Sequence, residues 1–274
     1  MQMTENQSVI APRSTEALAR LSAKHLPKLG AAYSPDDFLS HVAAQVPSHV
    51  FLGRSTQLVY LRQVAFLAAV LEDYEAVATE QLKVLDWGCG KGQVSYLLQS
   101  RGLNVSSCDV VTESDDSTFA QQIPIIEAKG IMVVPLQHPS EMPFGSQTFD
   151  CVVSFGVLEH VESDLASLHE IRRILKPGGI LFVTFLPYFL SWTQALYRLG
   201  GGRYHDRLYG KRQLRSMAES CGFKLASVWH GQLFPKTSVP IALDGVLEPL
   251  DRFLCNSTPL KYFATNLEAL LVAV

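Results

Sequence analysis

The sequence predicts an α/β protein built on a doubly wound, mostly parallel sheet with helices on both faces. Seven short apolar segments have the length and composition of buried strands. Segments with helical periodicity separate most of them, and strands that alternate with helices form a parallel sheet. The chain has 274 residues, of which 47% are hydrophobic and 18% charged. This length allows one large domain with an appendage, or two small domains.

The N-terminal part of the chain is predicted to be helical. Residues 1 to about 30 are polar and only weakly helical in pattern. The segment SPDDFLSHVAAQV begins like a helix, with Ser34 as N-cap and Pro35 at the first position. A long amphipathic helix is expected over Ser55–Ala78. We expect residues 1–54 to form a helical, partly flexible cap on a domain that spans 55–274.

Strands and helices then alternate. Strands are expected in KVLDWG (83–88), NVSSCDVV (104–111), IMVVPL (131–136), FDCVVSFG (149–156), ILFVTFLP (180–187), KLASVWHG (224–231) and LEALLVAV (267–274). Helices are expected in GQVSYLLQSRG (92–102), in ESDLASLHEIRRIL (162–175), which KPGG stops, and in GKRQLRSMAESCGF (210–223). Two helical inserts, about 187–210 and 232–264, are expected to cover a substrate pocket.

The segment VLDWGCGKGQ joins the first strand to its helix and carries Gly88, Gly90 and Gly92. Missing side chains let a ligand approach the backbone closely. A dinucleotide fingerprint needs its third glycine at the position of Gln93, and a P-loop needs Gly-Lys followed by Ser or Thr; neither pattern is present. The turn therefore predicts a different nucleotide-like ligand, or a turn with no ligand.

Two acids flank this turn. Asp86 ends the first strand, and Asp109 ends the next strand about twenty residues later. A carboxylate at the second position can accept hydrogen bonds from both hydroxyls of a ribose. The alternative is that both acids only cap a helix or a turn.

These segments resemble a known family. VLDWGCGKGQVSYLLQSRGLNVSSCDVV is similar to the first motif of class I S-adenosylmethionine-dependent methyltransferases. MPFGSQTFDCVVSFGVLEHVESDLASLHEIRRILKPGGILFVTF resembles the later motifs of their small-molecule group, often called type 11. The resemblance covers about Lys83–Val274. It implies a Rossmann-like, seven-stranded sheet whose last strand is antiparallel, and S-adenosyl-L-methionine as cofactor, released as S-adenosyl-L-homocysteine.

The resemblance also implies which residues bind the cofactor. They are Asp86, Gly88, Cys89, Gly90, Gly92, Asp109, Val110, Gln137, His138, Phe155 and Gly156. Asp86 would face the ammonium side of the cofactor, and Asp109 would bind the ribose. His138 stands where the family usually has an acid that contacts the adenine amine, so we expect either His138 or Gln137 to make that contact.

Methyl transfer from a sulfonium is an in-line displacement, and a hydroxyl acceptor benefits from a general base. The expected catalytic residues are His160, His205 and Tyr204, with Glu159, Asp206, Tyr188 and Tyr209 as further candidates.

Glu159 and His160 belong to the segment VLEHV, where such a pair often only packs against its neighbours and caps a helix. Similar quinone-pathway O-methyltransferases carry an extra Glu three residues before this pair and hold a divalent metal. Gly156 occupies that position here, so the sequence predicts no metal.

The first insert is rich in aromatic side chains beside hydrogen-bonding groups. We expect Tyr188, Trp192 and Tyr209 to bind an apolar or aromatic acceptor, with Gly200–Gly202 as a hinge. The alternative is that these aromatic rings pack only within the insert.

Composition and charge indicate which kinds of partner and which cell compartment to expect. The net charge is −3, which does not favour a nonspecific grip on nucleic acid. SFGVLEH also lacks the Asn/Asp-Pro-Pro-aromatic pattern of enzymes that methylate base amines. Five scattered cysteines indicate reduced thiols and a cytoplasmic protein. The N-terminus has no apolar signal segment, and the run ILFVTFLPYFL is too short to span a bilayer, so no stable membrane insertion is expected.

The function expected from these features is O-methylation of a small apolar or aromatic hydroxyl or carboxyl acceptor. The reaction would belong to secondary-metabolite, quinone, lipid or glycan modification, carried out by a monomer or homodimer. N- or C-methylation of a small molecule, methylation of nucleic acid or protein, and cofactor binding without catalysis are the alternatives.

Overall fold

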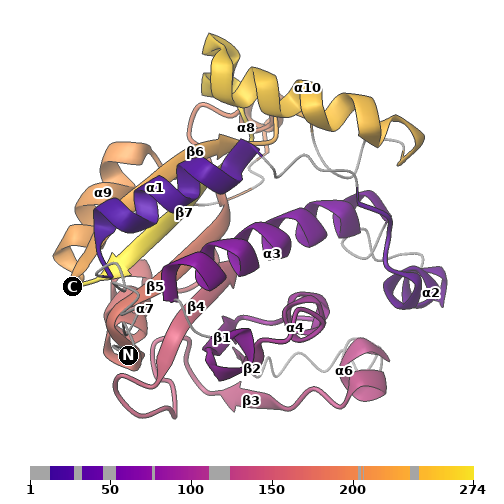
Figure 1. Cartoon of the computed structure of the whole chain (residues 1–274). Coiled ribbons are helices and arrows are strands. Elements are labelled where there is room, and N and C mark those ends of the chain that lie inside the picture. Colours follow the sequence, from indigo (N-terminus) through magenta and orange to yellow (C-terminus); the bar gives the residue numbers. More distant parts are fainter. Residues whose placement is uncertain are drawn as a thin grey trace, which may run out of the picture.

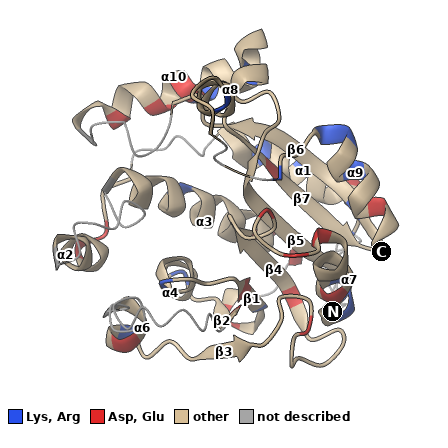
Figure 2. Ribbon diagram, turned by 180° about the vertical axis from the view of Figure 1, so that it is seen from behind, with Lys and Arg blue, Asp and Glu red and all other residues tan. Residues whose placement is uncertain are grey.

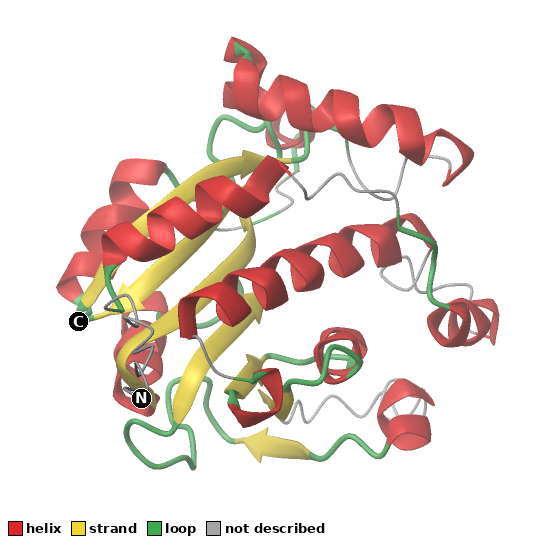
Figure 3. Cartoon of the chain, viewed as in Figure 1, coloured by secondary structure: helices red, strands yellow, loops and turns green. Residues whose placement is uncertain are grey.

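Seven strands form one sheet in the order β3-β2-β1-β4-β5-β7-β6. Figure 3 shows the strands in yellow and the helices in red. The strands are β1 (Lys83–Trp87), β2 (Asn104–Val110), β3 (Val133–Leu136), β4 (Phe149–Phe155), β5 (Leu175–Pro187), β6 (Phe223–Gly231) and β7 (Asn266–Ala273). Strand β7 runs antiparallel to β5 and β6, and the remaining pairs are parallel. The predicted fold class is therefore confirmed, including the direction of the last strand. The computed structural model describes residues 13–27, 33–45, 54–75, 78–110, 124–202, 205, 207–234 and 241–274.

Helices cover both faces of the sheet (Figure 1). They are α1 (Thr15–His25), α2 (Asp37–Gln45), α3 (Arg54–Glu75), α4 (Gln93–Gln99), α6 (Pro124–Lys129), α7 (Asp164–Ile174), α8 (Trp192–Leu199), α9 (Lys211–Ser220) and α10 (Asp244–Ser257). Short 3₁₀ turns are η3 (Thr79–Gln81), η5 (Ile241–Leu243) and η6 (Pro259–Phe263). One face packs against α1, α3 and α4, and the other against α7 and α9.

The two cores follow from the alternation of side chains along each strand. Val84 and Leu85 are neighbours in β1, but they belong to opposite cores because successive strand residues point to opposite faces. Val152 and Val153 of β4 divide in the same way. Since helices cover both faces, these strands are apolar at nearly every position, which is why they were visible in the sequence.

Two predicted element boundaries are wrong. Helix α2 begins at Asp37, and Asp36 caps it, because its Oδ1 accepts a hydrogen bond of 2.9 Å from the N–H of Leu39. Ser34 therefore lies outside the helix. The second is the start of β5. Helix α7 ends at Ile174, just before KPGG, as expected, but β5 begins at Leu175 rather than at Ile180 and includes KPGG, where Gly178 has a φ of 74°. The strand pairing shifts register close to this point.

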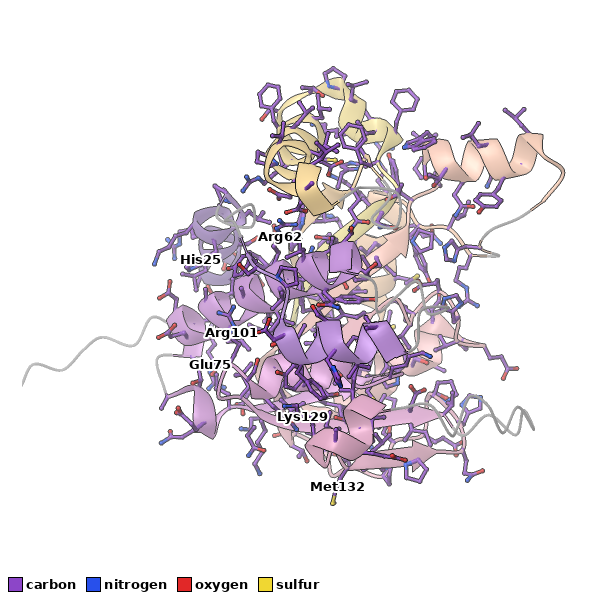
Figure 4. The ribbon with its side chains drawn as sticks, turned by 90° about the vertical axis from the view of Figure 1, so that its right-hand side faces the viewer. His25, Arg62, Glu75, Arg101, Lys129 and Met132 are labelled. Atoms are coloured by element: carbon purple, nitrogen blue, oxygen red, sulfur yellow. The ribbon has the colours of Figure 1, made fainter. Side chains whose placement is uncertain are left out.

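The first helix is packed on the main domain. Leu18 of α1 is fully buried, and the hydroxyls of Ser22 and Ser227 are 3.0 Å apart. At the C-terminal end of α1, Nε2 of His25 lies 2.8 Å from a carboxylate oxygen of Asp73 in α3. Figure 4 labels His25 and, at the end of α3, Glu75. The division of the chain at residue 54 stays a prediction.

Charge and hydropathy of the described residues bear on possible partners. Figure 2 shows basic and acidic residues interspersed along the helices and loops in that view. Such interspersion does not favour a nucleic-acid interface, which needs a basic face. Among the helices in the described ranges, none is both long and apolar enough to cross a membrane.

Candidate cofactor and acceptor site

The turn between β1 and α4 has a backbone conformation that glycine adopts most easily. Gly88, Gly90 and Gly92 have φ angles of 73°, 51° and 79°. The N–H of Gly88 donates to the carbonyl of Cys108 in β2 at 2.9 Å. A Cβ at Gly88 would lie 2.5 Å from Cγ2 of Val157, so tight packing also requires glycine there.

Gly90 differs from Gly88, because a Cβ at Gly90 would meet no atom within 4 Å. Its N–H donates to Oδ2 of Asp109 at 2.6 Å, while Oδ1 of Asp109 accepts from the N–H of Val110 at 2.7 Å. Asp109 therefore fixes the shape of the turn, and its contact with a ribose stays a prediction. The open space at Gly90 is space for a ligand rather than for packing.

A cavity of about 570 Å³ lies beside this turn, which is within the usual range for a small-molecule site. Its lining residues come from α3, the glycine turn, the ends of β4 and β5, α8, and the β6–β7 region. They are Thr56, Tyr60, Asp86, Gly88, Cys89, Gly90, Gln93, Val94, Phe155, Gly156, Glu159, His160, Phe185, Thr193, Gln194, Tyr197, His205, Gln232, Thr265 and Asn266. The structure thus brings nine of the predicted site residues and candidates together around one space: Asp86, Gly88, Cys89, Gly90, Phe155, Gly156, Glu159, His160 and His205.

Asp86 is one of the two acids among the described residues that line this cavity. It is buried, and its Oδ2 accepts a hydrogen bond of 2.6 Å from the hydroxyl of Ser95, which lies 2.8 Å from that of Ser107. Burial raises the pKa of Asp86 to about 7, although the Ser95 hydrogen bond works in the opposite direction. The carboxyl group can therefore change its charge near neutral pH.

Five further residues were predicted to bind the cofactor: Gly92, Asp109, Val110, Gln137 and His138. All five lie outside the set that lines the cavity. Nδ1 of His138 is 2.7 Å from the hydroxyl of Ser140, and its Nε2 is 3.3 Å from a carboxylate oxygen of Glu162. The cofactor contacts of these residues remain predictions.

The three aromatic residues predicted to bind the acceptor lie elsewhere. Tyr188 and Tyr209 are buried in the core beneath α9 and form an isolated bridge, and the Tyr209 hydroxyl donates to the carbonyl of Leu158 at 3.2 Å. Trp192 donates from Nε1 to the carbonyl of Leu233 at 2.7 Å, which ties α8 to the end of β6. These rings do not pack only within the insert either, because Tyr188 and Tyr209 belong to the core of the main sheet and Trp192 bonds to Leu233 outside the insert.

Other residues of the same insert line the cavity in their place. These are Thr193, Gln194 and Tyr197 of α8. The sequence predicted an insert rich in aromatic residues, but it did not show which face of α8 would point into the cavity. Thr56 and Tyr60 of α3 and Gln232 after β6 were missed because no motif marks them. Tyr204 lies outside the described residues.

Glu159, His160 and His205 form a cluster at the cavity wall. Each offers a nitrogen or oxygen donor, and these atoms all lie within 4.8 Å of one another. Oε1 of Glu159 is 3.8 Å from Nε2 of His160, and the rings of His160 and His205 have centroids 5.7 Å apart. Burial lowers the pKa of His160, so its ring is mainly neutral at pH 7. This cluster can accept a proton or bind a cation.

The fold and site define a class. A parallel sheet with a glycine turn after its first strand, an acid at the end of the next, and a cavity at the carboxyl ends is typical of a nucleotide-cofactor domain. Residues 85–183 match the family model described as a methyltransferase domain. This confirms the resemblance to class I S-adenosylmethionine-dependent methyltransferases, and it indicates S-adenosylmethionine as the cofactor.

Curated methyltransferases are similar in sequence to this chain over part of their length. The chain is 30% identical over 154 residues to the ubiquinone biosynthesis O-methyltransferase of Caulobacter vibrioides, which covers 56% of this chain and 59% of that one. It is 35% identical over 124 residues to the uncharacterized methyltransferase YodH of Bacillus subtilis, covering 43% and 48%. The chain thus spans about half the length of the curated relatives that it matches.

Solved structures share the fold. Magnesium protoporphyrin IX methyltransferase from Synechocystis, with S-adenosylhomocysteine bound, has a TM-score of 0.54 at 18% identity, over 87% of this chain and 97% of that one. A possible histamine N-methyltransferase from Thermotoga maritima has a TM-score of 0.54 at 14% identity, over 85% and 99%. At such identities the similarity establishes the fold alone.

Proposed function

We propose that this protein transfers the methyl group of S-adenosylmethionine to a hydroxyl oxygen of a small, largely apolar or aromatic molecule. The observation that carries this proposal is the single cavity that joins Asp86 and the glycine turn to the Glu159–His160–His205 cluster. One side suits the cofactor, and the other offers groups that assist removal of a proton from the acceptor.

The reaction needs alignment more than activation. The acceptor oxygen attacks the methyl carbon, the sulfur–carbon bond breaks, and S-adenosylhomocysteine leaves as a neutral thioether. The hydroxyl proton leaves with the help of the cluster. Because the sulfonium is already activated, the protein contributes mainly by orienting the acceptor and excluding water.

The lining favours an apolar acceptor. Tyr60, Phe155 and Phe185 form a group of aromatic rings, with centroids 5.5 to 6.0 Å apart, on one wall of the cavity. Tyr197 of α8 lies on the insert side. Oxygen as the acceptor atom is supported by relatives named ubiquinone biosynthesis O-methyltransferases. The five free, buried cysteines support the expected cytoplasmic location.

The test has two parts. Calorimetry with S-adenosylhomocysteine measures cofactor binding, and radiolabelled methyl donor measures transfer to a panel of phenols, matched aromatic amines, aromatic acids and RNA. We expect binding, and transfer to phenols above the others. The His205→Ala variant should slow turnover by roughly tenfold or more, as expected for loss of proton removal, while cofactor affinity stays within about twofold. His169→Ala on the exposed face of α7 is the matched control.

Other results of these experiments would support one of the alternative functions. Transfer mainly to amines makes the protein an N-methyltransferase, and transfer mainly to RNA makes it a nucleic-acid enzyme. Cofactor binding without transfer to any acceptor class contradicts the proposed catalysis. If His205→Ala turns over like the parent protein, His205 has no part in the reaction.

A further inference from the structure

We propose that Glu159, His160 and His205 form a binding site for a first-row divalent metal ion at the wall of the acceptor cavity. This inference rests on the proposed function for its role in catalysis, but the binding itself does not depend on it. The sequence pattern predicted no metal, because Gly156 supplies no donor beside the Glu159–His160 pair. The third donor comes from His205, in the insert after β5, which is distant in sequence and close in space.

The geometry needs only a small adjustment. The three donor atoms lie within 4.8 Å of one another. Donors bound to one zinc ion at about 2.0–2.2 Å are roughly 3–3.5 Å apart, so rotations that move the donors by about 1 Å close the set. The His160 side chain is 64% exposed and has space for such a rotation, whereas the Glu159 side chain is only 3% exposed.

The donor set selects the metal. Two imidazoles and one carboxylate suit Zn²⁺, Co²⁺ or Fe²⁺, whereas Mg²⁺ prefers oxygen donors and keeps its waters. Asp86 lines the same cavity and can add negative charge to it.

Three protein ligands leave coordination positions open, as in catalytic rather than structural zinc sites. A Cβ at Gly156 would lie 3.6 Å from Oε1 of Glu159, so the glycine leaves room beside this carboxylate. An acceptor hydroxyl that binds the metal there would lose its proton more easily, since the ion stabilises the oxyanion, and the proton would pass to water. The oxyanion would then attack the methyl carbon of the cofactor as the sulfur–carbon bond breaks, and S-adenosylhomocysteine would leave.

The first experiment measures binding without any reaction. The full-length protein, stripped with a chelator, is titrated with Co²⁺, and visible absorption is recorded. Zn²⁺ affinity is then measured by competition. We expect one Co²⁺ per chain with the intense spectrum of a low-coordinate site, and Mg²⁺ should not displace it. Glu159→Gln and His205→Ala should each weaken Zn²⁺ binding by about 100-fold or more, because a lost ligand costs at least as much as a lost outer-shell partner.

Matched variants distinguish this site from adventitious binding. His169→Ala and Glu141→Gln change exposed residues of the same types and should leave the affinity unchanged. His205→Asp restores an oxygen donor and should recover part of the binding that His205→Ala loses. Binding that is absent, or equally strong in Glu159→Gln and the parent protein, overturns the proposal. Thermal melting of each variant checks that it is folded.

The outcomes separate this inference from the proposed function. Methyl transfer to phenols by a protein that binds no metal leaves the function in place and removes the metal. Metal binding without transfer to any acceptor removes the function and leaves the site. If both hold, added Zn²⁺ or Co²⁺ should raise turnover of the stripped protein and not that of His205→Ala.

Discussion

At the scale of single residues, the ionisation of Asp86 should control how cofactor binding depends on pH. Burial raises the pKa of this acid to about 7. The carboxylate attracts the cofactor's ammonium group, whereas the neutral acid does not. We therefore expect the affinity for S-adenosylmethionine to rise as the pH increases through about 7 and then level off. Calorimetry over this range checks it, and Asp86→Asn should give a weaker and flatter profile.

The same residue should affect stability in the opposite sense. Its pKa in the folded protein exceeds the ordinary value of 3.8, so between pH 3.8 and about 7 the unfolded chain releases a proton that the folded chain keeps. Asp86 therefore destabilises the fold as the pH rises through this window. Asp86→Asn should be more stable than the parent protein above pH 7, by roughly 4 kcal/mol, and equal to it at low pH. Urea unfolding at both pH values measures the difference.

Gly88 and Gly90 should respond differently to the same substitution. A Cβ at Gly88 would lie 2.5 Å from the Val157 side chain, so Gly88→Ala should lower the melting temperature strongly. A Cβ at Gly90 meets open space, so Gly90→Ala should cost only the roughly 1 kcal/mol of a positive φ, yet reduce cofactor affinity at least tenfold. Thermal melts and calorimetry of the pair test this; unchanged affinity in Gly90→Ala contradicts the assignment of the turn to the cofactor.

At the scale of elements, helix α8 should determine how the acceptor binds. Tyr197 lines the cavity, while Leu199 of the same helix is 84% exposed and outside the lining. Tyr197→Ala should raise the KM for a phenolic acceptor by roughly fivefold to tenfold, as loss of an aromatic contact of about 1 kcal/mol implies, with cofactor affinity unchanged. Leu199→Ala is the control. Steady-state kinetics in which both variants behave alike would remove α8 from the acceptor site.

The sequence predicted where helices and strands lie better than it predicted which of their side chains face the cavity. The strands were readable because both faces are buried, and the glycine turn because its conformation demands particular residues. Tyr188, Trp192 and Tyr209 were chosen for their chemistry, but the docking of the insert buries two of these side chains and places Thr193, Gln194 and Tyr197 at the cavity. Such docking depends on tertiary contacts that no local pattern records. The proximity of His205 to His160 also depends on how the insert packs, so the sequence did not predict it.

At the scale of the whole molecule, cofactor binding should stabilise the fold, because the cavity joins α3, the sheet and both inserts. A ligand at about 100 times its Kd adds about 2.7 kcal/mol. For a chain of this size, that corresponds to a rise in Tm of roughly 5–10 °C. Differential scanning calorimetry with S-adenosylhomocysteine measures the rise, which should be much smaller for Gly90→Ala. A parent protein that melts at the same temperature with and without excess ligand contradicts a cofactor site in this cavity.

The position of β7 has a consequence for the order of events during synthesis. β7 lies between β5 and β6, although it follows both in the chain. During synthesis, one edge of β5 therefore stays unpaired until residues 266–273 have emerged from the ribosome. Until then, β6 also has no neighbouring strand in the sheet. Helix α1, made first, packs on β6 and β7, so its final docking must wait for them as well. The nascent chain therefore carries an open, apolar strand edge from the completion of β5 until β7 has emerged, a condition that favours aggregation and the binding of chaperones.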